Sequence, residues 1–206
     1  MTVHLDNYHT LHPEGRHLID GWFRRAWDQR DCAAAKSFEP FIFCWIAFNS
    51  WAACVTNVDQ DRQIIERLAG DAMLSEVFAD AVEQGHAFAG HAKAFQSFWP
   101  IFSAKDIRRS GIWRLAGGER RQIVQDYFDQ GLRNYEPRDP AQLRLCGAEF
   151  PLTWPNTLRV IYRVRCNLFH GEKSVASESD QQIVGAAFRV LVHIFQRFLQ
   201  EGPAGA

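Results

Sequence analysis

Residues 40–58 read PFIFCWIAFNSWAACVTNV and contain no charged side chain. About 20 consecutive apolar residues would span a bilayer, so the length of this stretch alone admits a membrane helix. Asn, Ser and Thr residues interrupt the run, however, and Glu39 and Asp59, rather than Lys or Arg, flank it. A helix that is apolar on all sides is also expected at the centre of a helical bundle. The stretch therefore predicts the core helix of an all-α protein, with no membrane span.

Helical periodicity continues on both sides of this core helix, and no stretch has the alternating pattern of a strand. Ser37 is expected to cap the core helix, and Gly70 and Gly85 to end the next two. The sequence predicts a bundle of about seven to eight helices in a single domain, 1–206, with a flexible lead-in at 1–15, a long loop at 134–155 and a flexible tail at 201–206. The expected helices cover residues 16–30, 38–55, a segment capped at 59 or 61 and running to 68, then 71–84, 87–98, 119–132, 156–170 and 180–200.

The composition is that of a globular protein, because 47% of the 206 residues are hydrophobic and 23% are charged. Disorder, collagen and fibrous coiled coils are thereby excluded. The 16 Phe and 7 Trp residues exceed what one core usually needs, which points to a homo-oligomer. Five cysteines without a C-x-x-C pair argue against a disulfide framework or a structural zinc site. With no signal peptide evident, we expect a cytoplasmic protein.

The charge is balanced overall but unevenly distributed along the chain. Residues 105–173 contain 13 Lys and Arg against 8 Asp and Glu, although the whole chain contains 23 against 24. A basic block of this kind could face a polyanion such as RNA. A solvated basic surface explains the same block equally well.

Residues 156–173, NTLRVIYRVRCNLFHGEK, carry the candidate chemistry. On a helix, Arg163, Asn167 and His170 lie at i, i+4 and i+7, within about 60° of one another, and could form a polar cluster. Arg165 lies instead within the apolar arc, where an arginine is normally paired or at an interface. Either a carboxylate from another helix meets Arg165, or this arc faces a second subunit.

His170 is the last residue before Gly171, at the end of this predicted helix. The partial negative charge of a helix C-terminus favours imidazolium, so His170 suits general acid or base catalysis. A histidine at this position can equally serve only as a cap that binds the last carbonyl groups.

The pair Arg165 and His170, with four residues between them and Gly171 following, resembles the signature of HEPN (higher eukaryotes and prokaryotes nucleotide-binding) ribonuclease domains. Arg163, with six residues before His170, also satisfies that signature, and the longer strings RVRCNLFHGEK and WIAFNSW are similar to HEPN-type sequences. The family commonly has a polar residue directly after the motif arginine, whereas Cys166 follows Arg165 here. The spacing in the family favours Arg165 as the catalytic arginine, and the helix geometry favours Arg163.

The resemblance implies metal-independent RNA cleavage, without a cofactor, at a composite site formed by a homodimer. His170 would then move a proton, Arg165 or Arg163 would neutralise charge on the phosphorane, and Asn167 would orient His170 or hold a phosphate. The resemblance also implies a toxin or phage-defence effector restrained by an antitoxin or another regulatory protein. The alternatives are a catalytically silent HEPN-like module that binds nucleotide, RNA or protein, and a helical scaffold in which Arg165 is a buried ion pair.

Four further basic residues could extend a path for RNA phosphates: Arg159, Lys173, Arg120 and Arg121. Each is also explained as solvated surface. The histidines near the N-terminus lack the spacing of metal ligands, so no metal site is expected. His91 is interpreted as a turn residue, and His193 as a buried core or interface residue.

Overall fold

The computed structural model describes residues 3–99, 101, 151–171 and 173–201 of the chain. Over these residues the chain forms eight α-helices, one short 3-10 turn and no strand, which confirms the predicted all-α helical bundle. In chain order, the elements are α1 (Asp6–His9), α2 (Pro13–Trp27), η1 (Ala34–Lys36), α3 (Phe38–Thr56), α4 (Asp61–Ala69), α5 (Ala72–Gln84), α6 (His86–Gln96), α10 (Trp154–Phe169) and α11 (Glu178–Gln200).

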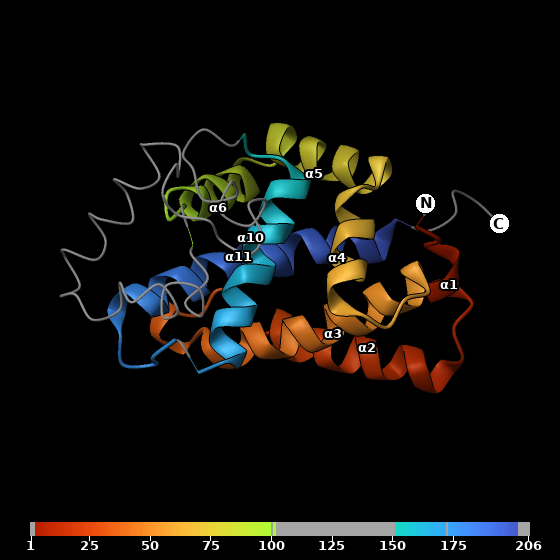
Figure 1. The fold of residues 1–206 in the computed structure, drawn as a ribbon, viewed down its shortest axis with the longest axis horizontal. Coiled ribbons are helices and arrows are strands. Elements are labelled where there is room, and N and C mark those ends of the chain that lie inside the picture. The colour runs from red at the N-terminus through yellow and green to blue at the C-terminus, as the bar shows by residue number, and fades with distance from the viewer. Residues whose placement is uncertain (1–2, 100, 102–150, 172, 202–206) are drawn as a thin grey trace, which may run out of the picture.

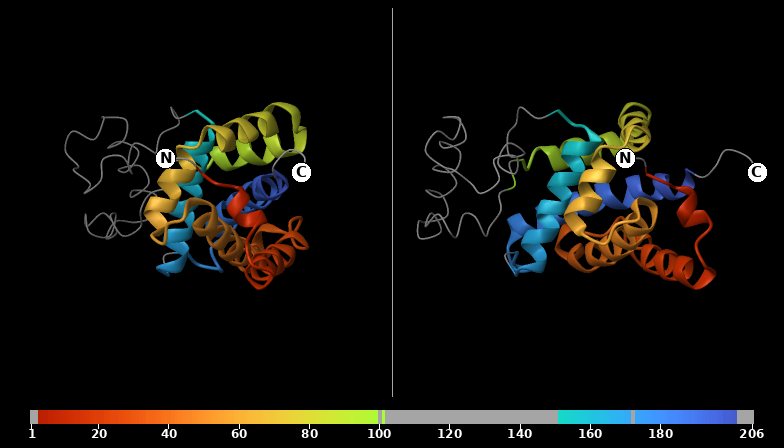
Figure 2. Two further views of the ribbon diagram at one scale, coloured as in Figure 1. Left: turned by 90° about the vertical axis from the view of Figure 1, so that its right-hand side faces the viewer. Right: turned by 45° about the vertical axis from the view of Figure 1, so that its right-hand side comes forward.

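The helices pack around α11, which contacts α2, α3, α5, α6, α10 and η1. Figure 1 shows α2, α3 and α11 running along the length of the molecule, while α4 and α10 cross them. Figure 2 shows α11 between the α2 and α3 pair on one side and the α5 and α6 pair on the other. This arrangement leaves α10 against α4, α5 and α11, with its C-terminal end at the surface.

Aromatic side chains fill the core between α3, α11 and their neighbours. The Phe195 ring is fully buried, with its centroid 5.0 Å from that of Phe23, 5.3 Å from that of Trp51 and 5.4 Å from that of Phe48. The indole nitrogen of Trp154 donates a hydrogen bond of 2.9 Å to the backbone oxygen of Leu68 and so ties α10 to α4. Most of the aromatic residues described are thus buried within one chain, and their abundance no longer argues by itself for a second subunit.

Most helix boundaries follow from capping residues in the sequence. Asp71 caps α5 by accepting a 3.0 Å hydrogen bond from the Leu74 amide, and Ser177 caps α11 by accepting one of 3.3 Å from the Asp180 amide. Ser37 precedes α3 as predicted, but its hydroxyl makes no cap. It donates instead to the backbone oxygen of Ala34 in the preceding 3-10 turn, over 2.6 Å.

The structure differs from the predictions mainly at the N-terminus. Residues 3–15, expected to be a flexible lead-in, contain α1 and the first turn of α2. Tyr8 is 4% exposed and its hydroxyl donates to a carboxylate oxygen of Asp20, so burial of one aromatic ring fixes the segment against α2. The predicted helix at 119–132, most of the predicted loop and the tail from 202 onwards lie outside the described residues.

Two helices, α3 and α11, are long and apolar enough to cross a membrane by length and composition. More than half of the most apolar part of each is buried inside the fold. Helices buried at the centre of a bundle have the same length and composition. The burial of α3 therefore agrees with its predicted place in the core, and α11 is buried there as well.

Candidate functional site

Helix α10 carries four of the predicted site residues and ends at the fifth. Pro155 fits the first turn, where a missing N–H costs nothing, and lets α10 start two residues earlier than predicted. The helix stops at His170, whose backbone N–H still donates to the oxygen of Cys166 over 3.1 Å, and Gly171 then adopts a φ of 70°. A left-handed residue after the helix favours glycine, which explains the predicted stop.

Arg165 lies in an aromatic cluster between α3, α4 and α10. Its Nη2 is 3.0 Å from Oδ2 of Asp61, and the two side chains are 22% and 29% exposed. The central carbon of the guanidinium lies 4.8 Å from the ring centroid of Phe169, 5.5 Å from that of Trp45 and 5.9 Å from that of Tyr162. The first of the two expectations for Arg165 is therefore confirmed, because a carboxylate from another helix meets it.

Two buried N–H groups of this cluster, Nε of Arg165 and Nε1 of Trp45, have no hydrogen-bond partner within the described residues. Asp61 thus balances the charge of Arg165, but the Arg165 guanidinium still has an N–H donor that Asp61 does not accept from. The neighbouring Tyr162 has its pKa raised to about 12, first by burial and then by its contact with Cys166. Its phenol therefore stays protonated near neutral pH and cannot act as a base there.

Arg163 and His170 have a different environment. They are seven residues apart, almost two turns, and so share one side of α10. His170 is exposed, while Arg163 is half-buried and has no ion-pair or hydrogen-bond partner in the part of the chain that the structure describes. A cation and an imidazole on one side of a helix end can bind a phosphate and move a proton beside it.

Asn167 does not join these two residues at the surface. It is 6% exposed and already engaged in an interaction, so only Arg163 and His170 of the predicted polar cluster are accessible to solvent. The reason is that α10 is covered over a wider arc than its apolar residues alone indicate.

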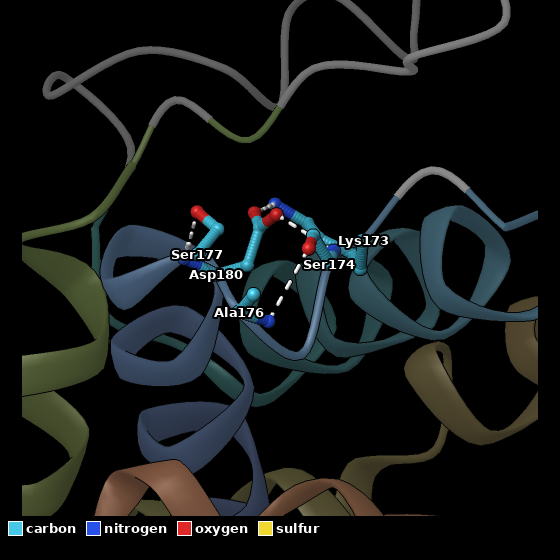
Figure 3. A network of polar contacts seen from close by, with 5 residues as sticks. All are labelled: Lys173, Ser174, Ala176, Ser177 and Asp180. Carbon is cyan, nitrogen blue, oxygen red and sulfur yellow. Dashed lines mark hydrogen bonds and ion pairs between the residues drawn. The ribbon is translucent and has the colours of Figure 1, made fainter.

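The other predicted RNA contacts on described residues are paired within the chain. Arg159 donates from two nitrogens to the two carboxylate oxygens of Glu66 on α4. Lys173 is 11% exposed and pairs with Oδ1 of Asp180, whose Oδ2 accepts a 3.0 Å hydrogen bond from the Ser174 amide (Figure 3). This network joins the loop after α10 to the first turn of α11. Arg120 and Arg121 lie outside the described residues.

A histidine pair between α6 and α11 was not predicted as a unit. The rings of His91 and His193 stack with centroids 5.3 Å apart and planes at 12°, and Trp27 packs against His193. Burial lowers the pKa of both histidines; the charge of Arg189 lowers that of His91 further, and the charge of His91 lowers that of His193. Within the described ranges, no group of three or more His, Cys, Asp or Glu side chains is arranged to hold a metal ion.

Comparisons with protein-family models, with characterised proteins and with solved structures found no match to this chain. The resemblance of residues 163–173 and 45–51 to HEPN domains therefore stays a prediction from the sequence alone.

Proposed function

We propose that the chain is a metal-independent endoribonuclease of the HEPN type, with its reactive groups at the C-terminal end of α10. One observation carries the proposal. The exposed imidazole of His170 shares a side of α10 with the guanidinium of Arg163, which has no partner among the described residues. The rest of the support is the resemblance in sequence.

The reaction assigned to this pair is a transesterification within RNA. His170 accepts the proton of a ribose 2′-OH, the 2′-oxygen bonds to the adjacent phosphorus, and the bond from phosphorus to the 5′-oxygen breaks. A protonated imidazole returns a proton to that leaving oxygen. The products are a 2′,3′-cyclic phosphate and a 5′-OH. Arg163 binds the phosphate oxygens and neutralises the charge that builds up on them.

Arg165 receives a positioning role in this proposal. Its charge is matched by Asp61, and its guanidinium packs against Trp45 on α3. An arginine held in this way fixes the last turns of α10 against α3 and α4. We therefore assign the phosphate contact to Arg163, as the helix geometry favours, and not to Arg165, as the family spacing favours.

The family resemblance adds an oligomeric state and a biological role to the proposal. A homodimer would bring two copies of the α10 end together and form a composite site, because a single His170 must otherwise supply both proton transfers. A cytoplasmic toxin or phage-defence effector restrained by an antitoxin is the biological role that fits such an activity.

A second candidate function is a catalytically silent HEPN-like module that binds RNA, nucleotide or a protein partner. The observation that favours it is the pairing of Arg159, Arg165 and Lys173 with carboxylates of the same chain. Three of the basic residues expected at the site are thereby neutralised, which reduces the attraction for a polyanion.

One experiment separates these candidates. Labelled structured RNA is incubated in EDTA with the wild type and with His170→Ala, Arg163→Ala and Arg165→Ala, and its ends are analysed for 2′,3′-cyclic phosphate. The proposal expects no cleavage by His170→Ala and a loss of about 100-fold or more for Arg163→Ala at unchanged thermal stability.

The outcomes assign the residues unambiguously. If Arg163→Ala is fully active and Arg165→Ala is folded but inactive, then Arg165, and not Arg163, contacts the phosphate. If the wild type does not cut but all four proteins bind RNA equally, the silent module replaces the enzyme, and His170 is a helix cap.

A further inference from the structure

Phe169, directly before His170, is the one exposed aromatic side chain among the described Phe, Trp and Tyr residues. It is 48% exposed, whereas the other aromatic residues are buried or half-buried. Burying a Phe side chain stabilises a fold by about 1.5–3 kcal/mol, and this stabilisation is partly lost at Phe169 although the other described aromatic side chains are at least half-buried. The exception lies at the end of α10, next to the proposed reactive histidine.

One face of this ring is already occupied by a cation. The guanidinium carbon of Arg165 lies over the Phe169 ring at 4.8 Å from its centroid, and Nη2 of the same guanidinium is 3.0 Å from Oδ2 of Asp61. The ring is therefore oriented by a buried contact, although almost half of its residue surface is exposed to solvent. An exposed aromatic ring fixed in one orientation is suited to stacking, because little side-chain freedom is lost when a planar partner binds.

We propose that Phe169 is a stacking platform for an unpaired RNA base, which makes the site selective for single-stranded RNA. This inference rests on the proposed function, since it places the base beside the phosphate that His170 and Arg163 would act on. Proteins recognise single-stranded RNA by stacking unpaired bases on aromatic side chains, whereas the bases of a duplex are already stacked on one another. A base on the open face would form a sandwich with Phe169 and Arg165.

The surroundings of Phe169 favour a base over a second copy of the chain. Stable protein interfaces bury about 1,200–2,000 Å² in total, far more than one ring supplies. Within the part of the chain that the structure describes, the other exposed large apolar residues are Leu18 and Met73, on α2 and α5, and Val175 in the loop after α10. Among the described residues, one exposed ring oriented by Arg165 matches one base better than a protein surface.

The test measures RNA binding separately from cleavage. Every protein carries His170→Ala, which prevents cleavage, and binds a fluorescein-labelled single-stranded oligonucleotide followed by anisotropy. The same oligonucleotide annealed to its complement serves as the duplex probe. The matched variants at position 169 are Phe169→Ala, Phe169→Leu, which keeps apolar bulk without a π-face, and Phe169→Tyr. Leu18→Ala controls for the loss of an exposed apolar side chain elsewhere.

We expect Phe169→Ala and Phe169→Leu each to weaken single-strand binding about 10-fold or more, and Phe169→Tyr to retain it. Duplex binding, and the binding of both probes by Leu18→Ala, should stay within about twofold of the parent. Equal single-strand binding by the Leu and Tyr variants would overturn the proposal. The proposal would also be overturned if the Phe169 variants lose RNA binding and sedimentation shows that they have dissociated from a dimer. Phe169 would then belong to an interface between two copies of the chain.

Failure of this inference and failure of the proposed function give different results. RNA cleavage by the wild type together with unchanged binding by the Phe169 variants overturns only the stacking platform. No cleavage by the wild type together with a Phe169-dependent preference for single strands overturns only the enzyme. If the His170→Ala protein binds neither probe, the stacking platform is overturned.

Discussion

The guanidinium of Arg165 on α10 lies 3.0 Å from the carboxylate of Asp61, the first residue of α4. A second pair, between Arg159 and Glu66, joins the same two helices. The two pairs differ in burial: Arg165 and Asp61 are 22% and 29% exposed, whereas Glu66 is 53% exposed. Helix α10 is thus attached to α4 by one largely buried and one solvated ion pair. Breaking each pair should therefore lower the free energy of unfolding by a different amount.

Asp61→Ala should lower the free energy of unfolding by about 1–3 kcal/mol, because it leaves the Arg165 charge partly buried without a counter-charge. Glu66→Ala breaks the exposed pair and should cost at most about 1 kcal/mol. Urea denaturation monitored by tryptophan fluorescence measures both changes. The double variant Asp61→Ala with Arg165→Met should recover part of the loss, since it removes both charges. Equal, small effects of Asp61→Ala and Glu66→Ala would show that the buried pair is no stronger than the exposed one.

Phe195→Ala should destabilise the protein by about 3–5 kcal/mol, because it opens a cavity where the rings of Phe23, Phe48 and Trp51 converge. Phe195→Leu fills most of that volume and should cost less. Leu18→Ala, at a position that is 65% exposed, should stay within about 0.5 kcal/mol of the wild type. Thermal unfolding followed by circular dichroism ranks the three variants. A Phe195→Ala protein as stable as Leu18→Ala would mean that these rings do not form the core.

The central part of the fold was predictable because its signals are local. The uncharged stretch after Ser37 specifies α3 through composition alone, and Asp71 and Gly70 mark helix ends through hydrogen bonds to their own neighbours in sequence. Tyr8 was missed for the opposite reason. Its burial depends on the hydrogen bond to Asp20 and on the packing of α1 against α3, neither of which the periodicity of a short polar lead-in indicates.

The candidate site was predicted only in part, because helix periodicity gives the face of a residue and not its partner. The position of Arg165 in the apolar arc correctly predicted a carboxylate from another helix. It could not identify Asp61, which is more than 100 residues away in the chain. The same periodicity put Asn167 beside His170 at the surface, and packing around α10 buries it.

Lys173 should act in stability and not in RNA binding. Its side chain is 11% exposed and its ammonium pairs with Asp180, so Lys173→Ala leaves that carboxylate unbalanced in the first turn of α11. We expect a lower melting temperature but an unchanged slope of log K against log salt for RNA, because no phosphate contact is lost. Ser177→Ala, which removes the cap of the same helix, should cost about 1 kcal/mol without altering RNA binding. If Lys173→Ala instead reduces the magnitude of the slope of log K against log salt by about 1, Lys173 contacts an RNA phosphate.

The stacked pair of His91 and His193 should make the fold sensitive to mild acid. Burial lowers the pKa of both histidines. The charge of Arg189 lowers the pKa of His91 further and the charge of His91 lowers that of His193, while Asp31 opposes both shifts without cancelling them. The unfolded state, where histidine has its ordinary pKa of about 6.5, then binds more protons than the folded state below neutral pH.

The free energy of unfolding should therefore be fully maintained above about pH 6.5 and fall as the pH drops from there towards 5. Urea midpoints measured between pH 7.5 and 5 test this, with the double variant His91→Gln and His193→Gln as the comparison. Glutamine keeps a polar side chain of similar size but does not titrate, so the decline between pH 6.5 and 5 should flatten. His17, an exposed histidine on α2, provides the control, because His17→Gln should leave the pH profile unchanged. An identical decline in the wild type and the double variant would assign the acid sensitivity to other groups.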